Sequence, residues 1–233
     1  RIINSIQECF PEEIDTFVDL FCGGCDVSIN TQANSIYAND INYHVIDIMK
    51  AFQQYDVDYL LEYIDTTINQ WCLNKTNEEG YKAFRDYYNK SKNPLDLYIL
   101  MCFSFNYQFR FNSNHDYNNP FGKNRSSFND VMRNNLIIFK GRIEDIHFSS
   151  FDFLDFDYDV LKAGDFIYAD PPYLLTCGSY NDGKRGFRGW TGHDDIELFR
   201  ILTELSDRGV NFALSNVIEH KGLTNCNLAD WAD

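Results

Sequence analysis

The pattern of apolar and polar positions predicts a βαβ unit at the beginning of the chain. A short run of β-type residues, 15–21, ends at two consecutive glycines, as a buried parallel strand does. The pattern predicts a crossover helix over 25–31, a second strand over 35–40 and a helix over 42–52. Two strands that are joined by a crossover form a parallel sheet, so we expect one here.

A different pattern begins near residue 55, where three helical stretches follow one another at 57–71, 76–90 and 94–105. The next stretch, 106–135, is polar and asparagine-rich, and it has no clear period. Loops of that length inside a compact domain are usually functional or disordered.

Strand patterns return in the second half of the chain. The sequence predicts strands over 136–139, 165–169 and 210–214, and an amphipathic helix over 193–208. The first strand and the strong later strand are too far apart for a plain doubly wound sheet. We therefore expect a discontinuous sheet domain, residues 1–54 and 136–233, with an inserted helical domain at residues 55–135.

Composition narrows the class of protein. The 233 residues are 44% hydrophobic and 24% charged, which is typical of a globular chain. No apolar run approaches the roughly 20 residues of a spanning helix, so we expect no membrane contact. Seven irregularly spaced cysteines indicate a reducing compartment, and we expect the cytoplasm. The net charge of −15 argues against non-specific coating of nucleic acid, although a locally positive groove remains compatible with it.

The most specific motif is the tetrapeptide Asp170-Pro171-Pro172-Tyr173, directly after the predicted strand 165–169. Ligands of open α/β sheets bind at the carboxyl ends of strands, where this motif falls. The prolines fix the backbone and lack N–H donors, which leaves carbonyls to accept hydrogen bonds. An adjacent carboxylate and a flat phenol ring complete a receptor for a planar group that carries an amino group. The alternative is an ordinary strand-end turn with a solvated Asp and a packed Tyr.

Two further features follow the first two strands. Gly23 and Gly24 allow a ligand to approach the backbone closely, although a simple strand-to-helix turn also uses glycine. Asp40 follows the second strand, where a carboxylate can accept from ribose hydroxyls. Cys22 and Cys25 form a C-x-x-C motif that is also typical of a redox pair, but the five prolines are poorly placed for such a domain. As half of a zinc site, the motif lacks a second C-x-x-C. The five histidines show no metal-ligand spacing, and we expect no metal site.

In this order, these motifs resemble those of the S-adenosylmethionine-dependent amino-methyltransferases that act on nucleic-acid bases. The tetrapeptide is similar to their catalytic motif, and residues 19–24 (DLFCGG) are similar to their cofactor motif. The order of these parts, a cofactor motif followed by a helical insertion and a catalytic motif, resembles the alpha group of these enzymes. Within that group, it resembles the Dam-type DNA adenine methyltransferases of bacteria and phages. The likeness covers residues 17–28, 38–41, 107–112, 119–123, 164–173 and 208–216.

The resemblance implies a Rossmann-like, doubly wound α/β sheet with an inserted helical target-recognition domain. It implies methyl transfer from S-adenosylmethionine to N6 of an adenine flipped out of duplex DNA, with GATC as the leading site, as in restriction–modification. It assigns catalysis to Asp170, Pro171, Pro172 and Tyr173, and cofactor binding to Asp19, Phe21, Gly23, Gly24, Asp40, Asp152 and Phe153. No Pro-Cys dipeptide occurs, which disfavours cytosine carbon-5 methylation.

The expected partner is double-stranded DNA, bound by a monomer or a weak dimer. Residues 106–142 hold six basic and two acidic side chains, a local charge of +4, and a second basic cluster comprises Lys184, Arg185 and Arg188. Either could instead be a solvated surface loop. From charge and resemblance together, we predict DNA contacts by Phe105, Tyr107, Arg110, Asn112, Pro120, Lys123, Arg125 and Tyr180.

Three alternatives stay open. Relatives carry a Gly- and Lys-containing cofactor motif ahead of the position of Arg1 and closing strands beyond Asp233, so we expect a fragment. A catalytically inactive DNA-binding remnant is therefore one alternative. Cytosine-N4 and RNA adenine methylation use the same chemistry and are the other two. Asp rather than Ser before the two prolines favours adenine.

Overall fold

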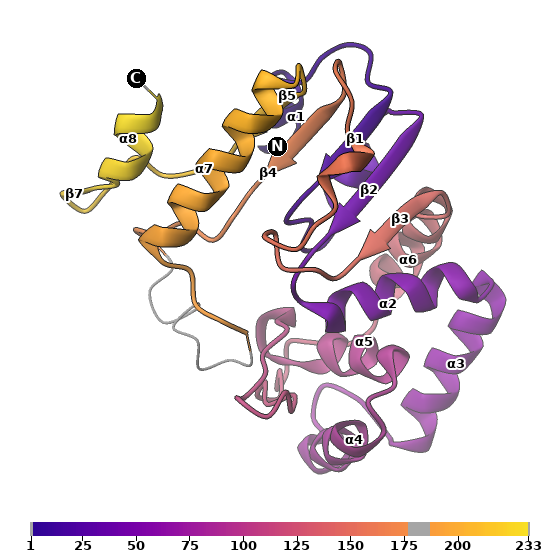
Figure 1. The fold of residues 1–233 in the computed structure, drawn as a ribbon. Coiled ribbons are helices and arrows are strands. Elements are labelled where there is room, and N and C mark those ends of the chain that lie inside the picture. Colours follow the sequence, from indigo (N-terminus) through magenta and orange to yellow (C-terminus); the bar gives the residue numbers. More distant parts are fainter. Residues whose placement is uncertain (1, 177–186, 233) are drawn as a thin grey trace. The chain divides into compact units, whose positions relative to one another are not determined.

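The computed structural model describes residues 2–176 and 187–232, and the chain divides into two compact units (Figure 1). The first, here called the sheet unit, comprises residues 1–46 and 145–233. The second, the helical unit, comprises residues 47–144. Helix α2 (Tyr43–Gln54) begins in the sheet unit and ends in the helical unit.

The sheet unit contains a five-stranded parallel sheet with the strand order β3-β2-β1-β4-β5. The strands are β1 (Thr16–Asp19), β2 (Ser35–Asn39), β3 (Ile146–Ser149), β4 (Phe166–Ala169) and β5 (Asn211–Leu214). This is the order of a doubly wound sheet, so the predicted fold class is confirmed. The order reverses between β1 and β4, and their carboxyl ends form the position at which such sheets bind ligands.

Both faces of the sheet are buried, which explains why its strands have near-continuous apolar sequences. On one face, the rings of Phe166 and Tyr168 lie 4.7 and 5.6 Å from the ring of Phe10, centroid to centroid. On the other face, Ile167 of β4 packs in a cluster with Leu198 of α7 (Gly192–Asp207). Neighbouring side chains of a strand point to opposite faces, so β4 contributes to both cores.

Short elements complete the sheet unit. They are α1 (Ile2–Gln7), the antiparallel pair β6 (Glu219–His220) and β7 (Leu223–Thr224), and α8 (Cys226–Ala232). Helix α7 starts with a capping box, in which Thr191 and Asp194 satisfy each other's backbone N–H groups. The ring of Trp231 in α8 stacks on Phe199 of α7, with centroids 4.6 Å apart.

Four helices form the core of the helical unit: α3 (Val57–Gln70), α4 (Glu78–Ser91), α5 (Pro94–Phe103) and α6 (Asp130–Arg142). Each begins at a side chain that accepts a hydrogen bond from the first turn, namely Asp56, Asn77, Asn93 and Asn129. Part of the asparagine-rich composition is therefore helix capping. Across the described residues, no helix is long and apolar enough to cross a membrane.

The predicted strand over 136–139 is wrong, because these residues belong to α6. Asn129 starts this helix by accepting a hydrogen bond from the Met132 N–H at 3.1 Å. Leu136 and Lys140 are its buried residues, four positions apart on one helical face, while Ile138 is 56% exposed. The apolar run of four residues was too short to distinguish the period of a helix from the period of a strand.

The predicted crossover helix over 25–31 is also wrong, since the structure has only a 3₁₀ turn at Ser28–Asn30. Gly23 and Cys25 both have positive φ angles, +47° and +67°. A right-handed helix requires negative φ angles, so it cannot include Cys25. The few residues between Cys25 and β2 are too few for a longer helix.

Candidate active site

A pocket of about 620 Å³ lies at the carboxyl ends of β1 and β4. The glycine turn and the tetrapeptide both line this pocket, although they are about 145 residues apart in the sequence. Its lining residues are Asp19, Phe21, Cys22, Gly23, Gly24, Asp26, Val27, Asp40, Ile41, Tyr168, Asp170, Pro171, Pro172, Tyr173 and Thr176. A side pocket of about 230 Å³ shares Phe21, Asp40, Ile41 and Pro172 with it.

Asp40 fixes the glycine turn to the end of β2. One carboxylate oxygen accepts from the Gly23 N–H at 2.9 Å, and the other accepts from the Asn42 N–H at 2.8 Å. Glycine adopts the positive φ of position 23 without strain, which explains the residue type there. The turn is thus held by a side chain that also faces the pocket.

The sequence argument missed Asn39, a buried side chain that joins the ends of three strands. Its amide donates to the carbonyls of Leu20 and Phe151 at 3.2 and 3.0 Å. Its oxygen accepts from the Ser149 hydroxyl at 2.8 Å and from the Phe151 N–H at 2.9 Å. The signal was an asparagine at the end of a strand where an apolar residue is expected.

Asp19 is a buried carboxyl group, 1% exposed, in the wall of the pocket. The Ser28 hydroxyl donates to one of its oxygens at 2.6 Å, and the other oxygen has no partner among the described residues. Burial raises the pKa of Asp19 to about 7, the Ser28 hydroxyl opposes the shift, and the carboxylates of Asp40 and Asp170 add to it. The negative charges of Asp19, Asp40 and Asp170 therefore repel one another, and a cation bound in the pocket would reduce this repulsion.

The lining of the large pocket is acidic. Four of its described residues are aspartates, Asp19, Asp26, Asp40 and Asp170, and none of its described lining residues is Lys or Arg. An anionic ligand such as a phosphate group would be repelled here, whereas a positively charged ligand is favoured. Over the described part of the chain, no group of three or more His, Cys, Asp or Glu side chains is arranged to hold a metal ion.

The tetrapeptide presents an aligned acceptor and ring. The Tyr173 hydroxyl donates to the Asp170 carboxylate at 2.7 Å. Burial raises the pKa of Asp170, while this hydrogen bond lowers it, and burial together with Asp170 raises the pKa of Tyr173 well above its usual value. Tyr173 therefore stays neutral, and its ring is oriented by the carboxylate.

Three aromatic rings gather at the side pocket. The rings of Phe21, Phe153 and Trp190 contact one another with centroids 5.2 to 5.8 Å apart. The Trp190 indole N–H donates to Asp195 at 2.8 Å, which fixes the plane of its ring. This wall is suited to the face of a planar ring. Sequence reasoning singled out Phe21 and Phe153 but missed Trp190, whose local signal was its place just before the capped helix α7.

Arg188 closes the side pocket with ion pairs. Its guanidinium donates to both oxygens of Asp152, at 2.5 and 3.0 Å, and also pairs with Asp194. Burial alone raises the pKa of Asp152, but the hydrogen bonds from Arg188 outweigh it and lower the pKa below its usual value. Arg188 is thus paired within the sheet unit rather than unpaired in a basic cluster. Lys184 and Arg185 lie outside the described residues.

We expect Arg188→Met to lower the free energy of unfolding by about 1–3 kcal/mol at pH 7, because buried Asp194 and half-buried Asp152 lose a charged donor. The pKa values of both aspartates are lowered in the folded state. The stabilisation is therefore present above their unfolded pKa, about 3.9, and is lost as the pH falls through the lower folded values.

Urea unfolding of the wild type and the variant at pH 7 and pH 3 measures this difference. The exposed Arg200, which pairs with Glu197 and Glu204, offers the matched control. We expect Arg200→Met to leave the free energy of unfolding almost unchanged, because water screens ion pairs at an exposed position. An Arg188→Met loss of equal size at both pH values would contradict the assigned ion pairs.

The C-x-x-C pair does not have the character of a redox site. Cys22 and Cys25 are both buried. Hydrogen bonding with Cys25, burial and the nearby Asp19 carboxylate raise the pKa of the Cys22 thiol well above its usual value. A reactive cysteine needs a lowered pKa, so Cys22 is not a reactive thiol and acts as a packing group in the pocket wall.

In the helical unit, residues 105–125 form a loop that is ordered by its own buried groups. The amide of buried Asn119 donates to the carbonyls of Phe105 and Gln108, both at 3.0 Å. Buried Tyr117 donates to the Gln108 carbonyl at 3.0 Å. A side chain at Gly122 would collide with Ser126, which explains the glycine in this turn. The loop therefore has a defined shape with little regular secondary structure, namely a 3₁₀ turn at Phe105–Tyr107 and isolated bridges.

Most of the predicted DNA contacts are exposed on this loop: Phe105, Tyr107, Arg110, Pro120, Lys123 and Arg125. The Arg125 guanidinium lies over the Phe105 ring, 5.1 Å from its centroid. Asn112 differs, because its oxygen accepts from the N–H groups of Asn114 and Asp116, both at 2.9 Å, and so shapes the loop. Tyr180 lies outside the described residues.

Comparison with known proteins gives a consistent group of relatives. A family model described as D12 class N6 adenine-specific DNA methyltransferase matches residues 1–231. The chain is 48% identical to the type II methyltransferase M.FokI of Planomicrobium okeanokoites and to the modification methylase StsI of Streptococcus sanguinis. All of the chain aligns with each, and it spans 36% of their length. It is 22% identical to the DNA adenine methylase of Escherichia coli K12, over 92% of the chain and 76% of that protein.

Proposed function

The chain belongs to the D12 class of N6 adenine-specific DNA methyltransferases, and from this membership we propose that it transfers a methyl group from S-adenosylmethionine to N6 of adenine in duplex DNA. The predicted family resemblance is confirmed. One observation carries the proposal: the glycine turn at Gly23 and the tetrapeptide that starts at Asp170 line a single acidic pocket.

The residues of the two pockets fit the proposed cofactor. When bound, S-adenosylmethionine supplies a methyl group activated by a positively charged sulfur. Asp19 has an unpartnered buried oxygen and shares the pocket wall with Asp40 and Asp170, so this wall favours a cation. In the proposal, Asp40 accepts from ribose hydroxyls, and the rings of Phe21 and Trp190 hold a purine in the side pocket. Both oxygens of Asp152 are bound to Arg188, so its contribution is to fix Arg188 in place.

The tetrapeptide is proposed to hold the target base. Asp170 and the carbonyl of Pro171 accept the two amino hydrogens, which leaves the nitrogen lone pair free to attack. The Tyr173 ring stacks on the base, and its hydroxyl stays bound to Asp170. The base must leave the duplex, because its amino group is not reachable inside the stack. Positioning and electrostatics then supply the acceleration.

The loop 105–125 is proposed to read and open the DNA, as the target-recognition part of the helical unit. Arg110, Lys123 and Arg125 would contact phosphates or guanine, and Phe105 and Tyr107, 41% and 42% exposed, would fill the space that the flipped base leaves. Asn112 would support the loop that carries them. GATC is the first sequence to test.

We expect the double variant Lys123→Gln/Arg125→Gln to weaken DNA binding about tenfold and to reduce the salt slope of binding by about 2. Both side chains are exposed on the loop. Fluorescence anisotropy with a 20-base-pair duplex at several salt concentrations measures both quantities. The variant Lys50→Gln/Lys90→Gln removes the same charge from exposed positions of the helical unit outside this loop. Equal losses in the two variants would remove the loop from the interface.

Transfer of tritiated methyl groups tests the function itself. The chain is incubated with labelled S-adenosylmethionine and duplexes with or without GATC, and the DNA is digested to nucleosides. The proposal predicts label in N6-methyl-2′-deoxyadenosine alone. Label in N4-methyl-2′-deoxycytidine, or in an RNA duplex offered in a parallel reaction, would assign one of the sister reactions. Binding of DNA and cofactor without label would identify a non-catalytic chain.

A further inference from the structure

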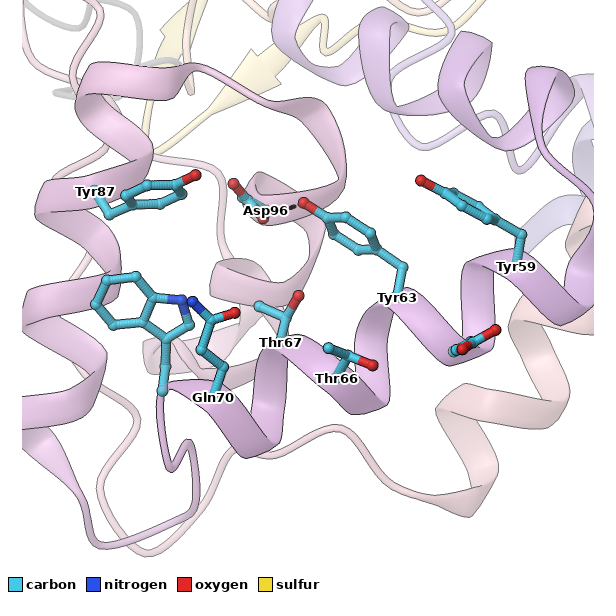
Figure 2. A pocket seen from close by; sticks show the side chains of 9 residues that line it. Tyr59, Tyr63, Thr66, Thr67, Gln70, Tyr87 and Asp96 are labelled. Atoms are coloured by element: carbon cyan, nitrogen blue, oxygen red, sulfur yellow. Dashed lines mark hydrogen bonds between the residues drawn. The ribbon is translucent and has the colours of Figure 1, made fainter.

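The helical unit contains a second pocket, of about 320 Å³, which no part of the proposed reaction uses. Figure 2 shows it between α3, which carries five of the labelled residues, and the facing side chains Tyr87 and Asp96. Its lining residues are Tyr59, Glu62, Tyr63, Thr66, Thr67, Gln70, Trp71, Tyr87 and Asp96. All belong to the helical unit, so the pocket is complete within one compact unit.

Aromatic rings form two walls of this pocket. The rings of Tyr59 and Tyr63 on α3 have centroids 6.2 Å apart. On the other side, Trp71 contacts Tyr87 at 5.3 Å and is supported from behind by Phe84 at 5.4 Å. The face of an aromatic ring carries negative charge and attracts a cation within about 6 Å. Tyr59 and Tyr87 remain 43% and 49% exposed, and the Tyr59 ring also stacks on Tyr55 with centroids 4.5 Å apart.

Asp96 lines the same pocket, and its carboxylate has one oxygen without a hydrogen-bond partner. The side chain is 2% exposed, and the Tyr63 hydroxyl donates to its Oδ1 at 2.8 Å. The amide of Asn93 donates to that hydroxyl at 3.1 Å, which directs the Tyr63 proton toward Asp96. Oδ2 is buried and has no hydrogen-bond partner among the described residues. An unpaired buried acceptor is costly, so a ligand that donates to it gains free energy.

Charge selects the type of ligand. None of the described residues that line the pocket is Lys or Arg, while Glu62 adds a second carboxylate. Burial raises the pKa of Asp96, and the hydrogen bond from the Tyr63 hydroxyl to Oδ1 lowers it. The nearby Ser91 hydroxyl also lowers it without a hydrogen bond to Oδ2, so a bound cation would favour the ionised form of Asp96. Phosphates and carboxylates are excluded by repulsion, and a neutral apolar ligand would leave Oδ2 unpaired.

We propose that this pocket binds a primary alkylammonium group, the chemistry shared by a lysine side chain and a polyamine. The ammonium donates to Oδ2 of Asp96 and to the Thr67 hydroxyl. The methylene chain passes between the Tyr63 ring and the Trp71 ring, and the Glu62 carboxylate adds attraction. The site belongs to the helical unit and is independent of methyl transfer.

Titration of the full chain with n-butylammonium chloride tests the proposal, followed by the NMR shift of the Trp71 indole N–H, which lies in the pocket wall. We expect a saturable shift with butylammonium and none with 1-butanol, which has a similar shape but no charge. Asp96→Asn keeps the acceptor for Tyr63 and should weaken binding at least tenfold. Glu79→Gln, an exposed charge change outside the pocket, should leave binding unchanged.

Two results would overturn the assignment: equal shifts with butylammonium and butanol, or unchanged affinity in Asp96→Asn. Tyr87→Leu, at an exposed ring, provides a second variant that does not disturb the core and should also weaken binding. Tetramethylammonium has no N–H donor, so tighter binding of this ion would contradict the role of Oδ2. Spermidine and Nα-acetyl-lysine methylamide separate the sources, because the tighter binder identifies a free polyamine or a partner's lysine.

Discussion

Replacement of Asp170 by alanine is expected to lower the rate of methyl transfer by about 10²- to 10³-fold or more, the cost of removing one preorganised group from a charge-stabilising site. Asp170 follows β4 and lines the acidic pocket. It orients Tyr173 by accepting a hydrogen bond from the Tyr173 hydroxyl at 2.7 Å. Under the proposed function, the variant loses both the acceptor for the amino group of the base and the group that orients the Tyr173 ring. The turnover number under saturating cofactor and DNA is the quantity to measure.

Binding of S-adenosylmethionine, measured by calorimetry, should fall far less than the rate in the same variant, because Asp19 and Asp40 remain in the pocket wall. Asp170→Asn separates the two roles, since it keeps an acceptor for Tyr173 but loses the charge. Asp155→Ala, at an exposed position of the sheet unit outside both pockets, serves as the control. Retained turnover in Asp170→Ala would remove this residue from the chemistry.

The sequence predicted the sheet well because both faces of its strands are buried. Residues 15–21, 35–40, 165–169 and 210–214 read as strands, and β1, β2, β4 and β5 lie within them. Strand β3 was missed, because only Ile146 of its four residues is buried and a polar His147 interrupts the run. An exposed edge strand has a weak apolar pattern, whereas the neighbouring helix α6 supplied a stronger one that was misread.

The sequence could place the motifs at the strand ends, because the topology of the sheet brings those ends together. It could not identify the residues that hydrogen-bond to them. The carboxyl ends of β1 and β4 are adjacent in the sheet, so the glycine turn and the tetrapeptide had to meet. The bonds of Asn39 to Phe151 and of Arg188 to Asp152 join residues far apart in the chain. Such pairs leave no local pattern. For the same reason, the pocket around Asp96 appears only when three helices are packed.

We expect Asp19→Asn to stabilise the ligand-free protein by up to about 4 kcal/mol at pH 8, although it removes a group from the pocket. Burial and the carboxylates of Asp40 and Asp170 raise the folded pKa of Asp19 to about 7, against about 3.9 when unfolded. Because the raised pKa belongs to the folded state, the stability that the proton provides is present below pH 4 and is lost as the pH rises toward 7.

Asparagine resembles the protonated form and still accepts from Ser28, so the variant escapes this loss. Urea unfolding at pH 4.5, 6 and 8 should therefore show a difference that grows from about 1 kcal/mol at pH 4.5 to its full size near pH 7.5. Asp26→Asn, an exposed lining residue, is the control and should stay within about 0.5 kcal/mol at each pH. A difference that is constant with pH would mean that Asp19 ionises normally. A cationic cofactor would then gain no additional free energy by neutralising this carboxylate. A growing difference would instead show that ionised Asp19 destabilises the folded chain, as expected where binding rather than folding has selected the residues.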